Sequence, residues 1–137
     1  MSYSLIMTAI DNVPVDVDKL ENFCLNNPSY NFDKSGTWTN LFYPVILYNT
    51  SKGWSYVCGV DKNRSSIDCV GPDDALYANV CKIADELNLF IIGEENEIYH
   101  IPNHGNPGRH LDFNKAKHVY EQHGLDLAVI INEAAVE

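Results

Sequence analysis

The sequence lacks the short motifs that mark most catalytic sites. It contains no Gly-x-Ser-x-Gly elbow, no Gly-x-Gly-x-x-Gly loop and no Walker pattern among its 137 residues. These absences argue against a nucleophilic serine of the hydrolase type and against a nucleotide site. No two of its four cysteines form a Cys-x-x-Cys pair, which excludes a zinc ribbon and a thioredoxin-type motif. We expect Cys24, Cys58, Cys69 and Cys81 to be free thiols.

Long hydrophobic runs are missing as well. The apolar segment Leu5–Ile10 has only six residues and follows no basic residue, so it fits neither a signal peptide nor a membrane span. We therefore expect the protein to act in the cytoplasm without a membrane partner. No repeat, linker or low-complexity segment interrupts the chain, and 45% of its residues are hydrophobic. This composition favours a single globular domain over residues 1–137.

Basic residues are scarce. Nine Lys and Arg residues stand against nineteen Asp and Glu residues, for a formal net charge of −10. Seven of the carboxylates, with Lys82 as the only basic residue, fall between Asp73 and His100. A negative field of this kind repels nucleic acids and attracts cationic molecules. The charge distribution therefore predicts a basic protein partner and no nucleic-acid partner.

The spacing of apolar residues predicts an α+β fold, in which an antiparallel sheet of five to seven strands carries two or three helices, mainly on one face. The expected strands are 2–10, 43–48, 54–60, 65–70, 89–92, 97–101 and 126–131. The expected helices begin at Asp16, after Gly71, and at Asp112 or Asn114, and the last of them ends at Gly124.

Three of these strands are expected to form a meander. Residues 43–48 and 54–60 flank a natural hairpin loop. Residues 65–70 are expected beside the second strand, with Cys58 opposite Cys69 and Val60 opposite Ile67. We expect segment 29–40 to be irregular and the tail from Glu133 to fray.

A ligand or metal site is one interpretation of the region around residues 94–110. Imidazole and carboxylate groups suit divalent metal ions and acid–base chemistry. The candidate groups are His100, His104, His110, Glu94, Glu95 and Glu97. Their spacing matches no established ligand motif, so we predict no metal, no cofactor and no catalytic residue. A small enzyme or ligand-binding domain with its site around His100–His110 stays an alternative.

The leading interpretation is a non-catalytic protein that binds a basic partner through its acidic segment. Acidic surfaces accelerate the association of such partners, and aromatic side chains anchor their interfaces. The residues predicted to contact the partner are Asp74, Asp85, Glu86, Glu94, Glu95, Glu97, Trp38 and Tyr99.

The same segment carries a resemblance to known proteins. Ile83-Ala84-x-x-Leu87, followed by Ile-Ile-Gly-Glu-Glu-x-Glu-Ile-Tyr at 91–99, is similar to a helix–strand–turn–strand unit of small bacterial proteins. Some of those proteins resemble the immunity partners of secreted polymorphic or type VI toxins. The resemblance implies a compact, acidic, cytoplasmic inhibitor without catalysis that neutralises a toxin. A phage or accessory protein that acts by interaction is a further alternative.

Overall fold

The structure is a computed structural model, and it describes residues 4–34, 45–60, 66–69, 74–104 and 111–136. Trp38 and His110 lie outside the described residues. The helices are α1 (Val17–Asn26), α2 (Asp74–Leu87), α3 (Phe113–His123) and α4 (Leu127–Glu133). The strands are β1 (Leu5–Thr8), β2 (Tyr30–Asp33), β3 (Val45–Thr50), β4 (Gly53–Gly59), β5 (Ser66–Cys69), β6 (Phe90–Ile92) and β7 (Ile98–His100).

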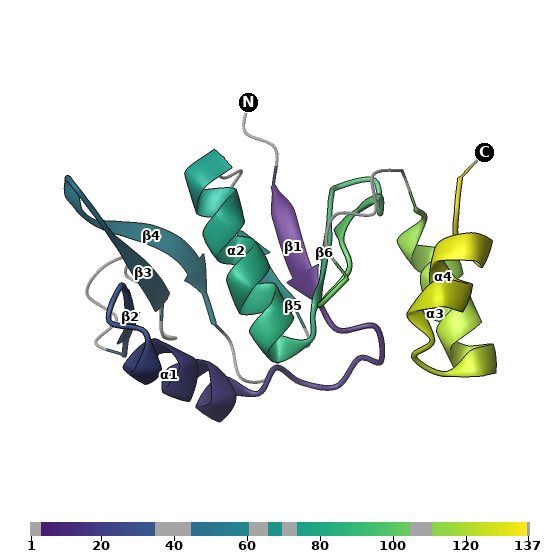
Figure 1. Ribbon diagram of the computed structural model, residues 1–137, viewed down its shortest axis with the longest axis horizontal. Coiled ribbons are helices and arrows are strands. Elements are labelled where there is room, and N and C mark those ends of the chain that lie inside the picture. The colour runs from purple at the N-terminus through teal and green to yellow at the C-terminus, as the bar shows by residue number, and fades with distance from the viewer. Residues whose placement is uncertain (1–3, 35–44, 61–65, 70–73, 105–110, 137) are drawn as a thin grey trace.

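The described strands form two antiparallel sheets. Four strands pair in the order β5-β1-β6-β7, and three pair in the order β2-β3-β4. The predicted α+β class and the antiparallel pairing are confirmed, with the strands divided between two sheets. Helices lie on both sides of the four-stranded sheet, α2 on one and α3 with α4 on the other (Figure 1).

Each face of the four-stranded sheet packs into its own hydrophobic core. Ile91 of β6 belongs to the first core, which lies between the sheet and α2. Its neighbours Phe90 and Ile92 belong to the second core, which lies between the sheet and the pair α3 and α4. On β1, Met7 packs in the first core and Ile6 against the second. Successive residues of a strand point to opposite faces, so β1 and β6 supply both cores.

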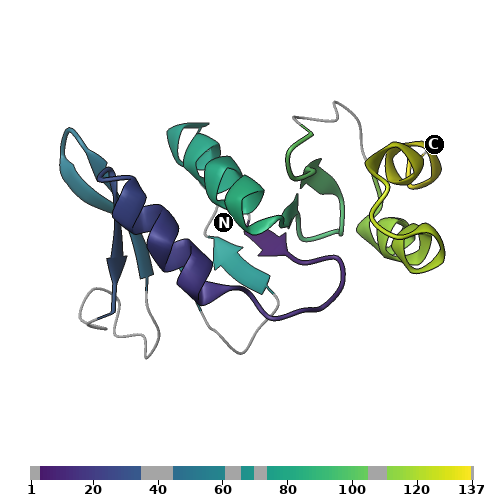
Figure 2. The ribbon, with the colours of Figure 1, turned by 60° about the horizontal axis from the view of Figure 1, so that its bottom comes forward.

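The first core continues to the three-stranded sheet. It includes Leu20 and Cys24 of α1, Ile46 of β3 and Cys58 of β4. Figure 2 shows α1 lying along this sheet, beside α2. The predicted hairpin of β3 and β4 is confirmed. Segment 30–33, predicted to be irregular, instead forms β2 and pairs with β3.

The prediction that residues 65–70 pair with the strand of Cys58 was wrong. Strand β5 pairs with β1 instead, with Cys69 opposite Leu5 and Ile67 opposite Met7. This pairing gives β1 a partner on both edges, β5 and β6, and so satisfies its backbone groups. Cys58 and Cys69 nevertheless belong to the same core, and a hydrogen bond with Cys69, together with burial, raises the pKa of the Cys58 thiol.

Three helices begin in the same way, at an aspartate that caps the first turn. A side-chain oxygen of Asp16 accepts a hydrogen bond from the Lys19 N–H at 3.0 Å. Asp112 caps α3 through Lys115, also at 3.0 Å. The starts predicted for these two helices are confirmed.

The segment predicted as a strand at 126–131 is helix α4, so that prediction was wrong. Asp126 caps it through the Val129 N–H at 3.3 Å. Ile130 and Ala134, four residues apart, are both fully buried, which is the spacing of one helix face. The tail is also ordered further than expected, because Ala135 forms a bridge with Leu111.

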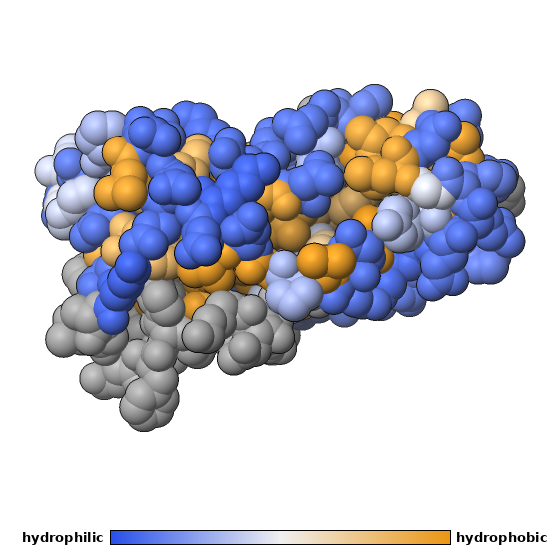
Figure 3. Space-filling model, turned by 90° about the horizontal axis from the view of Figure 1, so that it is seen from below, coloured by the Kyte–Doolittle hydropathy of each residue, from blue (hydrophilic) through white to orange (hydrophobic). Residues whose placement is uncertain are grey.

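The surface of the described residues is mixed. The large apolar side chains exposed there are scattered along the chain, namely Val13, Leu25, Trp54, Leu125 and Val136. Seen from below, hydrophilic residues cover much of the surface between smaller hydrophobic patches (Figure 3). No helix in the described part of the chain combines the length and the apolar character that crossing a membrane requires.

Candidate partner-binding site

The acidic hairpin of β6 and β7 forms as the sequence predicts. The Gly93 N–H donates to the Glu97 carbonyl at 2.9 Å, and the Asn96 N–H donates to the Gly93 carbonyl at 3.2 Å. Asn96 has a φ of 64°, a left-handed conformation that asparagine tolerates better than most residues. Glu94 and Glu95 consequently lie exposed at the tip.

Backbone contacts dock this hairpin against the start of α3. The Ile98 N–H donates to the Leu111 carbonyl at 2.9 Å, and the Phe113 N–H donates to the Asn96 carbonyl at 2.8 Å. A bridge between Glu97 and Asp112 lies between these two contacts. The hairpin carboxylates and the capping aspartate of α3 are thereby held next to one another.

These elements line an open concavity of about 520 Å³, which we call the acidic concavity. Its lining residues are Glu95, Asn96, Glu97, Tyr99, Leu111, Asp112 and Val136. Three of these seven residues are carboxylates and none is basic. The concavity therefore combines negative charge with the aromatic ring of Tyr99 and the exposed aliphatic side chain of Val136. This combination suits a cationic side chain with an apolar stem.

A second concavity, of about 420 Å³, lies on the side of α1 and α2. Its lining residues are Phe23, Asn27, Pro28, Ser29, Tyr30, Tyr48, Lys82, Asp85, Glu86 and Asn103. Tyr30 stands between Phe23 and Tyr48, with ring centroids 5.2 Å from each. Among the described residues, this concavity shares no lining residue with the acidic one, and its lining includes Lys82. Sequence reasoning did not find this aromatic cluster, because its members lie on different elements.

The predicted contact residues therefore divide into groups. Glu95, Glu97 and Tyr99 line the acidic concavity. Asp85 and Glu86 line the second one.

Two other predicted contact residues lie apart from both groups. Glu94 is exposed at the hairpin tip, where its Oε1 accepts a hydrogen bond from the Ser4 N–H at 3.1 Å. Asp74 is the first residue of α2, about 16 Å along the helix from Asp85 at 1.5 Å per residue. The acidic segment is thus spread over more than one surface.

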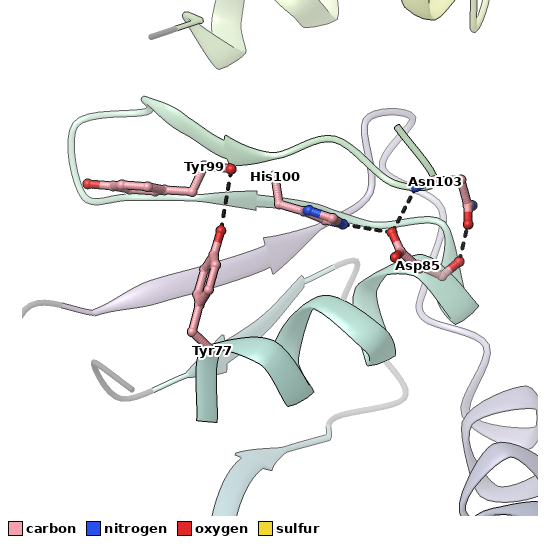
Figure 4. A network of polar contacts seen from close by, with 5 residues as sticks. All are labelled: Tyr77, Asp85, Tyr99, His100 and Asn103. Carbon is pink, nitrogen blue, oxygen red and sulfur yellow. Dashed lines mark hydrogen bonds and ion pairs between the residues drawn. The ribbon is translucent and has the colours of Figure 1, made fainter. Parts of the chain in front are cut away.

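Asp85 is held by internal contacts. His100 Nε2 of β7 lies 2.7 Å from Asp85 Oδ1, and the same oxygen accepts the Asn103 N–H at 2.8 Å (Figure 4). Asn103 Nδ2 donates to the Asp85 carbonyl at 3.3 Å. The Asp85 carboxylate therefore connects α2 to β7 and to the turn that follows it, a role that its place on a polar helix face did not indicate.

His100 is buried, and two neighbours control its protonation. Burial alone lowers its pKa, but hydrogen bonds to Cys81 and Asp85, and the charges of both, outweigh burial and raise the pKa of His100. Tyr77 of α2 joins the same network. Burial and its contacts with Cys81 raise the pKa of Tyr77, and its hydroxyl donates to the Tyr99 carbonyl at 3.3 Å (Figure 4).

The candidate metal ligands do not converge within the described residues. His100 already contacts the Asp85 carboxylate, while His104 is exposed in the turn after β7. Among the described side chains, no group of three or more His, Cys, Asp or Glu residues is arranged to hold a metal ion.

Sequence reasoning missed that Asp85 contacts His100 and that Cys81 and Asp85, both on α2, raise the pKa of this histidine. One signal was available, since Cys81 and Asp85 are four residues apart and so lie on one face of α2. The partner from β7 could not be found in this way, because strand β7 reaches the helix only through the tertiary fold.

Comparison with known proteins identifies no matching family model, no matching curated protein and no matching solved structure. The chemistry of the acidic concavity and its surroundings is therefore the basis for proposing a function.

Proposed function

We propose that this protein is a non-catalytic acidic binding protein, and specifically a bacterial immunity protein that neutralises a toxin by covering a basic surface. The observation that carries this proposal is the acidic concavity, an open space of about 520 Å³ lined by Glu95, Glu97 and Asp112, with no basic residue among the described residues that line it. We infer that an arginine or lysine of the partner enters this space.

The lining of the concavity supports a basic side chain as its occupant. Carboxylates form charge-assisted hydrogen bonds with guanidinium and ammonium groups, and these are about twice as strong as neutral hydrogen bonds. Tyr99 and Val136 offer apolar contact to the methylene stem of the same side chain. Arginine fits best, because its planar group also stacks on aromatic rings.

The net charge supports the same partner at longer range. A formal charge of −10 attracts basic proteins and accelerates their encounter. Toxins that bind phosphate-bearing substrates present basic grooves, and an acidic protein competes for such grooves. A cytoplasmic inhibitor of this kind needs no chemistry of its own.

The docking of the hairpin favours tight binding. The backbone hydrogen bonds from Ile98 and Phe113 fix the acidic concavity before any partner arrives. A preorganised site loses less conformational entropy on association than a mobile one. We therefore expect the hairpin to bind with little change in its backbone.

The proposal is tested by capture from the native lysate on tagged protein, followed by elution with a salt gradient and mass spectrometry. We expect a basic protein in stoichiometric amount that is released only at high salt. Expression of that partner alone should inhibit growth, and co-expression with this protein should restore it. A captured partner that is acidic, insensitive to salt or harmless when expressed alone would contradict the proposal.

A further inference from the structure

The second concavity lies between parts of the chain that are far apart in sequence. Its lining comes from the end of α1 and the turn into β2, from β3, from the last turns of α2 and from the turn after β7. Figure 2 shows α1 and α2 side by side. Small-molecule sites favour such junctions between structural units, with volumes of about 300–1,000 Å³. The second concavity, of about 420 Å³, is within this range.

One side of this concavity is aromatic. Tyr30 is buried, its ring tilted by 51° against Phe23 and by 54° against Tyr48. Its hydroxyl donates a hydrogen bond to the buried side chain of Asn79, which fixes the ring. Phe23 and Tyr48 are only half-buried, and both line the concavity. Their accessible parts offer an aromatic surface on which a ligand ring can pack.

The other side of the concavity carries charges of both signs. Lys82, Asp85 and Glu86 all come from the C-terminal half of α2 and line the same space. Residues three and four positions apart lie on one side of a helix, with Cβ atoms about 5–6 Å apart. Among the described residues, however, no ion pair joins Lys82 to either carboxylate. An ammonium group and two carboxylates therefore stand close together without neutralising one another.

We propose that the second concavity binds a small aromatic zwitterion, namely a free α-amino acid with an aromatic side chain. Lys82 binds the carboxylate of this ligand, and Glu86, with the charge of Asp85 beside it, binds the ammonium group. The ligand ring packs on Phe23 and Tyr48. This function is separate from partner binding, because the two concavities share no lining residue among the described residues.

The spacing of the charges favours a zwitterion over a simple ion. The ammonium and carboxylate groups of an α-amino acid are attached to the same carbon, so they need two opposite charges that lie close together. Lys82 and Glu86, four positions apart on α2, meet this requirement. A ligand with only a positive charge is repelled by Lys82, and a ligand with only a negative charge is repelled by Asp85 and Glu86.

Internal contacts hold both sides of the concavity in place. Asp85 Oδ1 lies 2.7 Å from His100 Nε2 and accepts the Asn103 N–H at 2.8 Å, while Asp85 Oδ2 takes part in neither contact (Figure 4). On the aromatic side, Asn27 Nδ2 donates to the Phe23 carbonyl at 2.7 Å. A site that is fixed in advance loses less conformational entropy when the ligand binds.

The test is a titration of the ¹⁵N-labelled full chain with L-phenylalanine, followed by backbone amide chemical shifts. We expect saturable shifts around the second concavity, with a dissociation constant on the order of 1 mM or tighter. Phenethylamine lacks the carboxylate, 3-phenylpropionate lacks the ammonium group, and N-acetyl-phenylalaninamide lacks both charges. Each of these should bind at least about tenfold more weakly, because a charged group of the site loses its partner.

Matched variants assign the binding to individual charges. Lys82→Met and Glu86→Gln should each weaken L-phenylalanine binding by about tenfold. Lys52→Met and Glu121→Gln make the same changes outside the concavity and should leave the affinity unaltered. All four side chains are exposed, so the melting temperatures should stay nearly the same.

Several results would overturn the proposal. One is a titration of the unaltered protein in which the shifts do not saturate or arise away from the second concavity, a result that requires no variant. Another is equal binding of L-phenylalanine and N-acetyl-phenylalaninamide, and a third is equal affinity of Lys82→Met and Lys52→Met. None of these results affects the capture of a basic partner, so a failure here is distinguishable from a failure of the partner-binding function.

Discussion

Asp85 and His100 join the C-terminal end of α2 to strand β7 through a contact of 2.7 Å between Oδ1 and Nε2. The contact is largely buried on the histidine side, where only 7% of the side chain is exposed. Because β7 is also one strand of the acidic hairpin, this contact helps to fix the hairpin relative to the helix. Its strength depends on the protonation of His100.

The first prediction concerns pH. The pKa of His100 is raised in the folded protein, above an unfolded value of about 6.5. A raised folded pKa contributes stability in full below the unfolded pKa, and this stability is lost as pH rises through the folded pKa. The free energy of unfolding that His100 contributes should therefore be larger at pH 6 than at pH 8.5.

This is measured by urea denaturation of the unaltered protein and of His100→Gln at both pH values. The comparison isolates His100, since the other titratable groups are common to both proteins. A difference between the two proteins that stays constant would mean that folding does not raise the pKa of His100. A difference that grows as pH rises would mean that the buried histidine is stabilised mainly in its neutral form.

The second prediction tests helix α4. Ile130 is fully buried, while Val129 and Ile131 are half-buried. Ile130→Ala should lower the free energy of unfolding by about 2–5 kcal/mol, and Ile131→Ala should lower it by less. A strand at the same place would bury residues 127, 129 and 131 together. If urea denaturation instead showed a larger loss of unfolding free energy for Ile131→Ala than for Ile130→Ala, the segment would be a strand and not a helix.

The third prediction tests the cap of α1. Asp16→Ala removes the acceptor for the Lys19 N–H and should lower the free energy of unfolding by about 1 kcal/mol. Asp16→Asn is the matched control, because asparagine caps helices about as well as aspartate. Thermal or urea denaturation of the two variants compares them directly. Equal losses in both would mean that the charge of Asp16 matters and its cap does not.

Local signals in the sequence predicted much of the fold. Asp16 and Asp112 mark helix starts through their own side chains, and Gly124, with a φ of 75°, ends α3 as expected. The acidic turn after β6 likewise follows from Gly93 and Asn96. Each of these features depends on residues within a few positions of one another, which is why the sequence reveals them.

Features that depend on distant residues were not predictable in this way. Strand β5 pairs with β1, more than fifty residues earlier in the chain, although β4 is nearer. The run Leu-Ala-Val-Ile-Ile at 127–131 is short and apolar, so its period does not distinguish helix from strand. Only the packing of Ile130 in the second core decides it.

The candidate site shows the same limit. The carboxylates of the hairpin were recognisable, but the acidic concavity also needs Asp112, Leu111 and Val136 from the C-terminal part of the chain. Asp85 was expected to face solvent with the other acidic residues, and its partner His100 comes from a different element. Charge content could be read from the sequence, whereas the grouping of charges required the fold.

The most direct test of the central claim is the association rate of the captured partner with a matched pair of charge-reversal variants. Glu95→Lys changes the acidic concavity, and Glu121→Lys makes the same change of charge at an exposed position of α3 outside it. Rates are measured over a range of salt concentrations. Melting temperatures should be nearly unaltered in both variants, because both side chains are exposed.

We predict that Glu95→Lys slows association at low salt by more than Glu121→Lys, raises the dissociation rate and weakens the dependence on salt. Both variants change the net charge equally, and this change explains the slower association of Glu121→Lys. Any further slowing in Glu95→Lys is therefore caused by the change in the acidic concavity. Equal rates for the two variants at every salt concentration would contradict the claim that the acidic concavity binds the partner.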